Sequence, residues 1–328
     1  MRGASNHLYI VSVSKIIGCI IFCNKTSIYC EIQQEDIFMN NTNLALLEKN
    51  RDILSIRDLA TGTIATYTSY LTDYINWVEE NLPGRSLSDV TWEEIRSYEK
   101  YLKDVRKLNP RTINIFISQL RDFYNYVLHK DWDRREVPLL RFDEKLPVVP
   151  TQEEVISIIN AIDNPKHKAE IALLYSSGIR VSELCRLHCG DIHMSTENIY
   201  ISRSKNRSDR YAILSQNALH NLIDYIHQSY RTARRENWLF PGQREGEHIS
   251  TESVRQIFRR HLESIGLSDK GYRLHSLRHA FGLHLYNKGV DLVTIKEALG
   301  HKSLSSTIVY VTLGIGNGRT VKSPYDDI

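Results

Sequence analysis

Residues 274–289 read LHSLRHAFGLHLYNKG, and this helical stretch decides how the rest of the chain is interpreted. His275 and Arg278 stand one turn apart on one helix face, so both side chains can point at a single oxyanion. His275 and His279 have the i, i+4 spacing of zinc peptidase ligands, but Ser276 stands where those enzymes carry a catalytic glutamate. The stretch therefore favours an anion-binding face over a metal site.

The composition is that of an ordinary globular protein, with 41% hydrophobic and 25% charged residues. A length of 328 residues suits two domains. The net charge is only +3, so total charge does not by itself indicate a nucleic-acid partner. The 5 cysteines form no disulfide framework, because three of them fall within the first thirty residues. We expect a reducing, cytoplasmic location.

The amino-terminal leader, residues 1–38, is interpreted apart from the rest. Residues 8–23 are apolar apart from Lys15 and two serines. This run is short for a membrane span and carries a central charge, and no small-residue cleavage site follows it. We expect translation to begin at Met39, so that the leader is not translated and no membrane is involved. The alternatives are a short extra strand or a partner-binding arm.

Residues 39–135 are expected to form a domain of four helices. Apolar and aromatic residues such as Ile64, Tyr67 and Leu71 recur at three- and four-residue spacing, which is typical of helices. Two prolines within 145–150 then mark a linker over 136–150. The expected helices lie near 44–58, 63–81, 91–104 and 110–127.

Residues 151–312 are expected to form a second, mostly helical domain, followed by a tail over 313–328 without an apparent helix. Two β-rich runs, 199–201 and 211–214, are joined by a polar basic turn, which predicts a β-hairpin with Lys205 near its tip. The expected helices lie at 152–162, 167–177, 181–188, 215–230, 250–264, 275–288, 291–299 and 303–312.

Two local patterns in this second domain combine positive charge with helix ends or turns. Gly178 ends one helix and Arg180 begins the next, where a helix start and a guanidinium together suit a phosphate. Glu183 lies one turn further and can hold that guanidinium, although a surface ion pair is the alternative. Lys205 on its turn can reach a neighbouring site and donate a proton, although a solvated charge is the alternative.

A further pattern places a histidine close to a tyrosine. Gly300 ends a helix, His301 stands at its exposed end, and Tyr310 follows on the next helical segment. A phenol has a pKa of about 10, so it needs a base and nearby positive charge to act as a nucleophile. His275 and the two arginines could supply both.

Taken in order, these patterns resemble the active-site set of the tyrosine recombinases, the phage-integrase-type site-specific recombinases. The resemblance rests on SGIRVSELCRL, on a basic hairpin with one lysine, on LHSLRHAFGLHLYNKG and on LGHKSLSSTIVY. It covers 151–312 strongly and 40–135 more weakly. It implies a mainly α fold, in which a helical SAM-like core-binding domain precedes a mostly α catalytic domain with a small β-hairpin or sheet.

The resemblance also implies a reaction. Tyr310 would attack the scissile phosphate to give a 3′-phosphotyrosyl enzyme and a free 5′-hydroxyl, and a partner strand would reverse the step. Two arginines and a histidine would stabilise the non-bridging oxygens, His275 would accept the tyrosine proton, and Lys205 would protonate the leaving oxygen. No metal or other cofactor is implied. The candidate catalytic set is Arg180, Lys205, His275, Arg278, His301 and Tyr310, with Glu183 in support.

The implied partner is double-stranded DNA, clamped between the two domains mainly through phosphate contacts. The family further implies a homotetramer acting on two DNA sites, with accessory DNA-bending proteins as further partners. Exposed charge unrelated to DNA is the alternative for each candidate contact residue. The candidates are Arg111, Asn114, Arg203, Arg207, Arg255, Arg259 and Arg260.

The chain resembles the simple two-domain, Xer-like kind of recombinase, but its glycine-containing tail differs from that of Xer proteins. A mobile-element integrase or transposon recombinase is therefore preferred. The rivals are a type IB topoisomerase and a non-catalytic DNA-binding regulator on the same fold. A metal-dependent nuclease is disfavoured because no paired carboxylate cluster is found. Cys185, His188, Cys189 and His193 are a nominal metal-ligand cluster. They lie along an expected amphipathic helix and its exit, where cysteines usually act as small core residues, so a metal site is disfavoured there.

Overall fold

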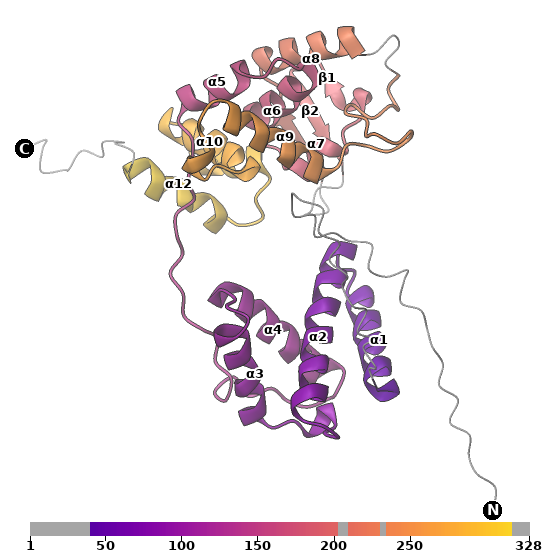
Figure 1. The fold of residues 1–328 in the computed structure, drawn as a ribbon. Helices are drawn as coiled ribbons and strands as arrows, with labels where there is room; N and C mark the ends of the chain where they lie inside the picture. The colour runs from indigo at the N-terminus through magenta and orange to yellow at the C-terminus, as the bar shows by residue number, and fades with distance from the viewer. Residues whose placement is uncertain (1–39, 203–208, 230–233, 317–328) are drawn as a thin grey trace, which may run out of the picture. The chain divides into compact units, whose positions relative to one another are not determined.

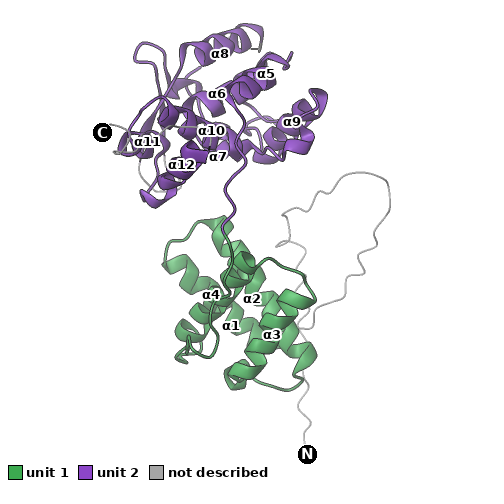
Figure 2. Ribbon diagram, turned by 90° about the vertical axis from the view of Figure 1, so that its left-hand side faces the viewer, with its two compact units in different colours: residues 1–143 green, residues 144–328 purple. Residues whose placement is uncertain are grey.

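The computed structural model describes residues 40–202, 209–229 and 234–316, and its described part is mainly helical with one small sheet (Figure 1). This confirms the expected fold class. The chain divides into two compact units, Met1–Asp143 and Glu144–Ile328 (Figure 2), and the division falls inside the expected linker. The leader, the turn that carries Lys205, and the tail beyond Gly316 lie outside the described residues.

The described part of the first unit contains four α-helices, and local capping explains where they begin. Thr91 and Glu94 form a reciprocal capping box at the start of the third helix. Asn109 caps the fourth, and Pro110 occupies its first position, where the missing N–H costs nothing. The helices are α1 (Asn41–Ile56), α2 (Thr61–Asn81), α3 (Trp92–Asp104) and α4 (Pro110–Tyr126), with a 3₁₀ turn, η1, at Leu87–Asp89.

The core of the first unit is rich in aromatic side chains. Tyr74, Tyr98 and Tyr124 are almost completely buried there. The hydroxyls of Tyr74 and Tyr124 lie 2.7 Å apart, and Tyr124 also donates to the carbonyl of Leu87 at 3.2 Å. Each buried hydroxyl of this pair is therefore satisfied, which a stable core requires.

The second unit surrounds a buried helix with further helices and a sheet. Helix α6 packs against α8, α9 and α10, and α10 packs in turn against α11 and α12. Figure 1 shows α10 and α12 next to each other. The helices are α5 (Gln152–Asn160), α6 (Pro165–Ser177), α7 (Val181–Cys185), α8 (Gln216–Ser229), α9 (Thr251–Ser264), α10 (Leu274–Asn287), α11 (Leu292–Leu299) and α12 (Ser305–Gly316), with 3₁₀ turns η2 (Cys189–Asp191) and η3 (Ser268–Lys270).

The sheet has three antiparallel strands in the order β1 (Ile192–His193), β2 (Asn198–Ile201) and β3 (Arg210–Ile213). The expected hairpin corresponds to β2 and β3, with Ile199 opposite Ala212. Strand β1 was not expected, because two residues are too few to show an alternating pattern. It adds an edge to the hairpin through the pairing of Ile192 with Ile199.

Two helix ends in the second unit differ from expectation. Helix α7 ends at Cys185 rather than near 188, and the chain then turns through η2. Helix α12 continues to Gly316 instead of ending at 312, because Leu313 and Gly314 are buried and extend its packing. Within the described residues, no helix is long and apolar enough to cross a membrane.

Candidate active site

Arg278 is almost completely buried in the candidate site. Its side chain is only 3% exposed, and Nη1 and Nη2 donate to the carbonyls of Gly178 and Leu299, the second at 2.7 Å. These carbonyls lie at the carboxyl ends of α6 and α11, where the helix dipoles favour a cation. Burial and the nearby Arg180 lower the pKa of Arg278 to about 10, so the guanidinium stays charged at neutral pH.

Arg180 is fixed by Glu183, as its spacing predicts, but Glu183 has a second partner. Glu183 Oε1 accepts from Arg180 Nη1 at 2.9 Å, and Oε2 accepts from the Arg180 backbone N–H at 2.8 Å. Arg210 on β3 donates to the same two oxygens at 3.0 and 2.8 Å. Burial acts to raise the pKa of Glu183, but the hydrogen bonds and charges of both arginines lower it to about 2. Glu183 is therefore a permanent anion between two cations.

His301 and His275 lie close to Arg278 and Arg180. His301 Nδ1 lies 2.9 Å from the hydroxyl of Thr307, which is fully buried. Loss of solvation, Arg278 and Arg180 lower the pKa of His301 to about 4. The same three causes lower the pKa of His275, whose side chain is nevertheless exposed at the surface. Both rings are expected to be neutral imidazoles at pH 7, able to accept or donate a proton.

Tyr310 enters the site from α12 of the same chain. The residue is fully buried, and its hydroxyl lies 3.5 Å from Nδ1 of His279 on α10. A Cβ at Gly282 would lie within 3 Å of the Tyr310 ring, so the glycine makes room for it. Burial raises the pKa of Tyr310 to about 12 against the opposing charge of Arg278. The phenol is therefore neutral in this arrangement.

His279 was not expected to take part. Its ring lies 4.6 Å from that of His275 and 6.1 Å from that of Tyr310, measured between centroids, so it stands between them. The sequence signal is the i, i+4 spacing of His275 and His279, a spacing that also suits metal ligands. Ser276, the residue that argued against a metal, accepts a hydrogen bond from the Arg273 backbone N–H at the start of α10.

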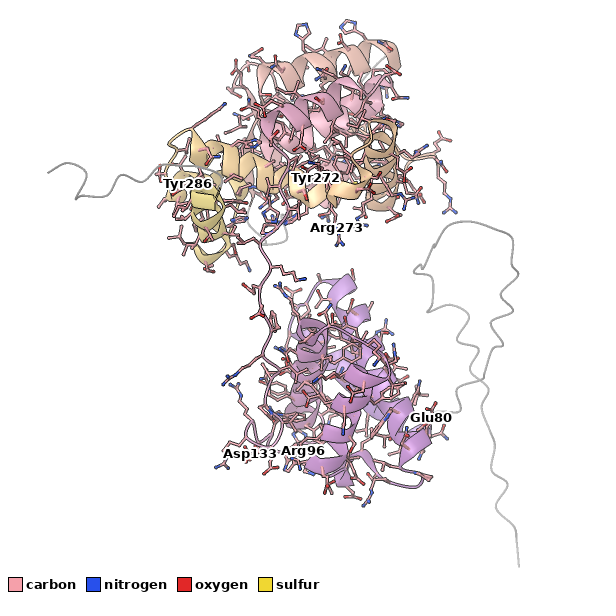
Figure 3. The ribbon with its side chains drawn as sticks, turned by 60° about the vertical axis from the view of Figure 1, so that its left-hand side comes forward. Glu80, Arg96, Asp133, Tyr272, Arg273 and Tyr286 are labelled. Atoms are coloured by element: carbon pink, nitrogen blue, oxygen red, sulfur yellow. The ribbon has the colours of Figure 1, made fainter. Side chains whose placement is uncertain are left out.

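Five of the candidate residues thus lie close enough to interact electrostatically. Arg278 interacts with Arg180 and Tyr310, and His301 interacts with Arg278, Arg180 and His275. The segment entering α10 borders the site, and Figure 3 labels Tyr272 and Arg273 there. Lys205, Arg203 and Arg207 lie outside the described residues. In the part of the chain that the structure describes, no three His, Cys, Asp or Glu side chains gather as metal ligands.

The remaining candidates for DNA contact are distributed over both units. Arg111 is exposed at the start of α4. Asn114 is tied to the backbone of Leu140, donating from Nδ2 at 2.9 Å and accepting at Oδ1 at 2.8 Å. On α9 the exposed candidates are Arg255, Arg259 and Arg260, of which the first two pair with Glu252 and Glu263.

Comparison with known proteins identifies the family. Residues 149–314 match the phage integrase family, and residues 46–134 match the phage integrase N-terminal SAM-like domain. The chain belongs to the phage integrase family of tyrosine recombinases. It is a tyrosine-type site-specific recombinase that cleaves and rejoins DNA.

Individual relatives of this tyrosine recombinase agree with that assignment. It is 37% identical to the putative integrase/recombinase y4eF of Sinorhizobium fredii over 71% of this chain and 92% of the relative. It is 28% identical to the tyrosine recombinase XerA of Pyrococcus horikoshii over 82% of this chain and 89% of the relative.

Solved structures show the same fold. XerH bound to a palindromic difH substrate matches with a TM-score of 0.66 and 21% identity, over 83% of this chain and 81% of that one. The Tn1549 transposon integrase in complex with transposon right end DNA matches with a TM-score of 0.65 and 18% identity, over 86% of this chain and 96% of that one. These likenesses establish the architecture of the recombinase.

Proposed function

We propose that Tyr310 is the nucleophile of this recombinase and forms a 3′-phosphotyrosyl bond with DNA. The observation that carries the proposal is the insertion of Tyr310 between α12 and α10, where its hydroxyl meets His279 and its ring lies in the field of Arg278. The phenolic oxygen attacks the scissile phosphorus as the bond to the 5′-oxygen breaks. The phosphodiester energy is kept in the new bond, so the reverse attack by a 5′-hydroxyl reseals DNA without a nucleotide cofactor.

Charge on the non-bridging oxygens is stabilised by Arg180 and Arg278, with His301 as a further donor. Each is held in place before DNA arrives, by Glu183, by two backbone carbonyls and by Thr307 respectively. Donors fixed in this way need little reorganisation during the reaction, which is the main source of electrostatic catalysis.

Two proton transfers complete the step. The neutral rings of His275 and His279 offer acceptors for the proton of Tyr310, and the hydroxyl contact favours transfer through His279 towards His275. The leaving 5′-oxygen takes its proton from Lys205 in this proposal. A sulfur in place of that oxygen leaves as a thiolate without protonation, so it should restore cleavage to the Lys205→Ala variant.

The biological setting is proposed from the relatives. Among the similar structures, XerH is bound to a difH substrate, a lambda integrase dimer to a core site and a transposon integrase to transposon DNA. We infer that this chain binds duplex DNA in the cytoplasm and acts for a mobile element, as a homotetramer that joins two sites with accessory DNA-bending proteins.

The test is to trap covalent protein–DNA adducts in cells that carry the native flanking DNA, and to sequence the attached DNA and peptide. Adducts are expected on the Tyr310 peptide at a discrete site and are expected to vanish in Tyr310→Phe. Tyr126→Phe, at an exposed tyrosine of α4, is the matched control and should form adducts normally. Sequence-specific binding without any adduct would instead indicate a regulator.

A further inference from the structure

The Glu183 carboxylate is shared by two guanidiniums, and only one of them belongs to the proposed catalytic set. The carboxylate is 2% exposed, the Arg180 side chain 21% and the Arg210 side chain 11%. Arg210 engages both carboxylate oxygens through its two terminal nitrogens, which is the strongest geometry available to an arginine and a carboxylate. Arg180 reaches one of these oxygens with Nη1, so its guanidinium keeps further donors for another acceptor.

The second arginine, Arg210, changes the net charge of the cluster. Arg180 and Glu183 alone sum to zero, so a phosphate approaching them would meet a guanidinium already neutralised by a buried anion. Addition of Arg210 leaves a net charge of +1 on the cluster. Since the cluster is largely removed from water, this unit of charge acts on a bound phosphate with little screening.

The packing around Arg210 also points to a specific position. Arg210 is the first residue of β3, and a Cβ at Gly300 would lie 2.7 Å from both its Cδ and its Nε. Gly300 immediately precedes His301, and its carbonyl lies 3.5 Å from Arg180 Nη2. Arg210 therefore fills the junction between the segments that carry Arg180 and His301.

We propose that Arg210 is a positioning residue for strand cleavage, which holds Glu183 so that Arg180 keeps both its orientation and its positive charge for the scissile phosphate. The inference rests on the proposed role of Arg180 at that phosphate. Arg210 acts through Glu183 rather than by touching DNA, because both its terminal nitrogens bind the carboxylate and its side chain is only 11% exposed.

The test separates loss of charge balance from loss of packing. Cleavage is measured as the rate of adduct formation on a duplex of the site identified by adduct sequencing, nicked so that cleavage is trapped, and DNA affinity is measured in parallel. Arg210→Gln is expected to slow cleavage about 100-fold, the effect of losing one preorganised electrostatic group, with affinity changed less than about threefold. Arg210→Lys keeps the charge and is expected to retain cleavage within about tenfold of the parent.

The deciding variant is Glu183→Gln combined with Arg210→Gln. It removes the buried anion together with one cation, so Arg180 is again an unneutralised charge. Cleavage is expected to recover at least tenfold relative to Arg210→Gln alone. If Arg210 served only to tie β3 to α7, the double variant would be no faster than the single one, and that result would overturn the proposal.

Two controls keep the outcomes distinguishable. Arg244→Gln removes an arginine from an exposed pair with Glu247 and should change neither rate nor affinity. Arg180→Gln should abolish cleavage. If it does not, the proposed catalytic set is wrong, whereas loss in Arg180→Gln together with full activity in Arg210→Gln refutes only the present inference. Should Arg210→Gln fail to fold, Arg210→Lys decides: cleavage within about tenfold of the parent supports the proposal, and a loss of about 100-fold in folded Arg210→Lys would overturn it.

Discussion

The two compact units bury polar side chains of different kinds. In the described part of the first unit the buried polar residues are neutral amides, Asn43, Asn50 and Gln119, whereas the second unit also buries Glu170, Glu183 and Arg278. A buried charge costs several kcal/mol unless it is paired and hydrogen-bonded. Glu183 and Arg278, both in the candidate active site, bear that cost, whereas Glu170 avoids it by staying protonated at neutral pH.

Buried tyrosines show the same contrast. Burial raises the pKa of Tyr74 and of Tyr124 in the first unit, and the further causes that raise the pKa of Tyr74 are neighbouring tyrosines and Glu94. Tyr310 is equally buried, but the field of Arg278 opposes the rise. At Tyr98 of the first unit the charge of Arg106 also opposes the rise, but the carboxylate of Asp73 acts against it, whereas Arg278 acts on Tyr310 without such a carboxylate among its causes.

The largest expected effect tests whether the buried charge in the second unit is functional. Arg278→Leu should reduce cleavage at least about 1000-fold, since it removes a phosphate-stabilising group. It should also lower the free energy of unfolding by about 2–4 kcal/mol, because the carbonyls of Gly178 and Leu299 lose their donors. Adduct assays and denaturant unfolding measure the two effects.

The matched change in the first unit is Arg106→Leu, where the arginine forms an exposed pair with Asp73. Unfolding should change by less than about 1 kcal/mol there, and cleavage should stay near that of the parent. Equal losses of stability in the two variants would contradict the contrast between the units.

A smaller effect on cleavage is expected at Gly300, and it isolates the packing of Arg210. Gly300 and Gly289 both have positive φ, 64° and 90°, so alanine strains the backbone at each by about 1 kcal/mol. Only at Gly300 would the new Cβ strike Arg210, because nothing lies within 4 Å at Gly289. Gly300→Ala should therefore slow adduct formation about tenfold through the displaced guanidinium. Equal rates in Gly300→Ala and Gly289→Ala would show that Arg210 adapts freely.

The stability of the second unit should depend on pH through Glu170, which is not one of the candidate site residues. Both carboxyl oxygens are buried and have no hydrogen-bond partner among the described residues. Burial raises the pKa of Glu170 to about 8, with the charge of Lys166 opposing. The folded state then holds a proton that the unfolded state releases above its pKa of about 4.5, so stability falls as pH rises from that value towards 8, by up to about 1.4 kcal/mol per pH unit.

Glu170→Gln should remove this fall. Denaturant unfolding at pH 5, 6.5 and 8 is expected to show a weaker decline for the variant than for the parent, with the largest difference at pH 8. A parent and variant that decline in parallel would refute the raised pKa. Cleavage at pH 7 should be the same in both, because Glu170 is protonated and neutral there, as the amide of the variant is.

The smallest expected effect is in the first unit. Tyr74→Phe removes one partner of a buried hydroxyl pair and should destabilise the chain by about 1 kcal/mol, while Tyr124 keeps the carbonyl of Leu87 as acceptor. Adduct formation should be unchanged when the variant is folded. A specific loss of cleavage in Tyr74→Phe would show that the first unit contributes buried polar groups to catalysis after all.

Local sequence rules for helix capping and apolar spacing predicted where many of the helices lie. Thr91, Asn109 and Thr151 cap the helices that their neighbours form, and the apolar spacing around Ile64 predicted α2. The hairpin followed in the same way, whereas the fold class followed from the resemblance to the tyrosine recombinases. Glu183 could be assigned to Arg180 because the two are one turn apart in sequence.

Contacts between distant segments were beyond such rules. Arg210 meets Glu183 across 27 positions and Tyr310 meets His279 across 31, and neither pair leaves a periodic trace in the sequence. Strand β1 forms through its antiparallel pairing with β2 and has no sequence pattern of its own. Of the candidate site, the sequence patterns and the family resemblance supplied the residues proposed to act on the phosphate more readily than those that hold them or contact the proposed nucleophile.

The docking of α12 on α10 of its own chain has a genetic consequence. Because Tyr310 meets His279 within one polypeptide, an assembly that mixes a Tyr310→Phe chain with an Arg278→Leu chain contains no subunit with both groups intact. Two such alleles expressed together should not complement each other. In the proposed homotetramer, either allele alone should also interfere with the wild type, since a mixed tetramer contains subunits that cannot cleave their strand.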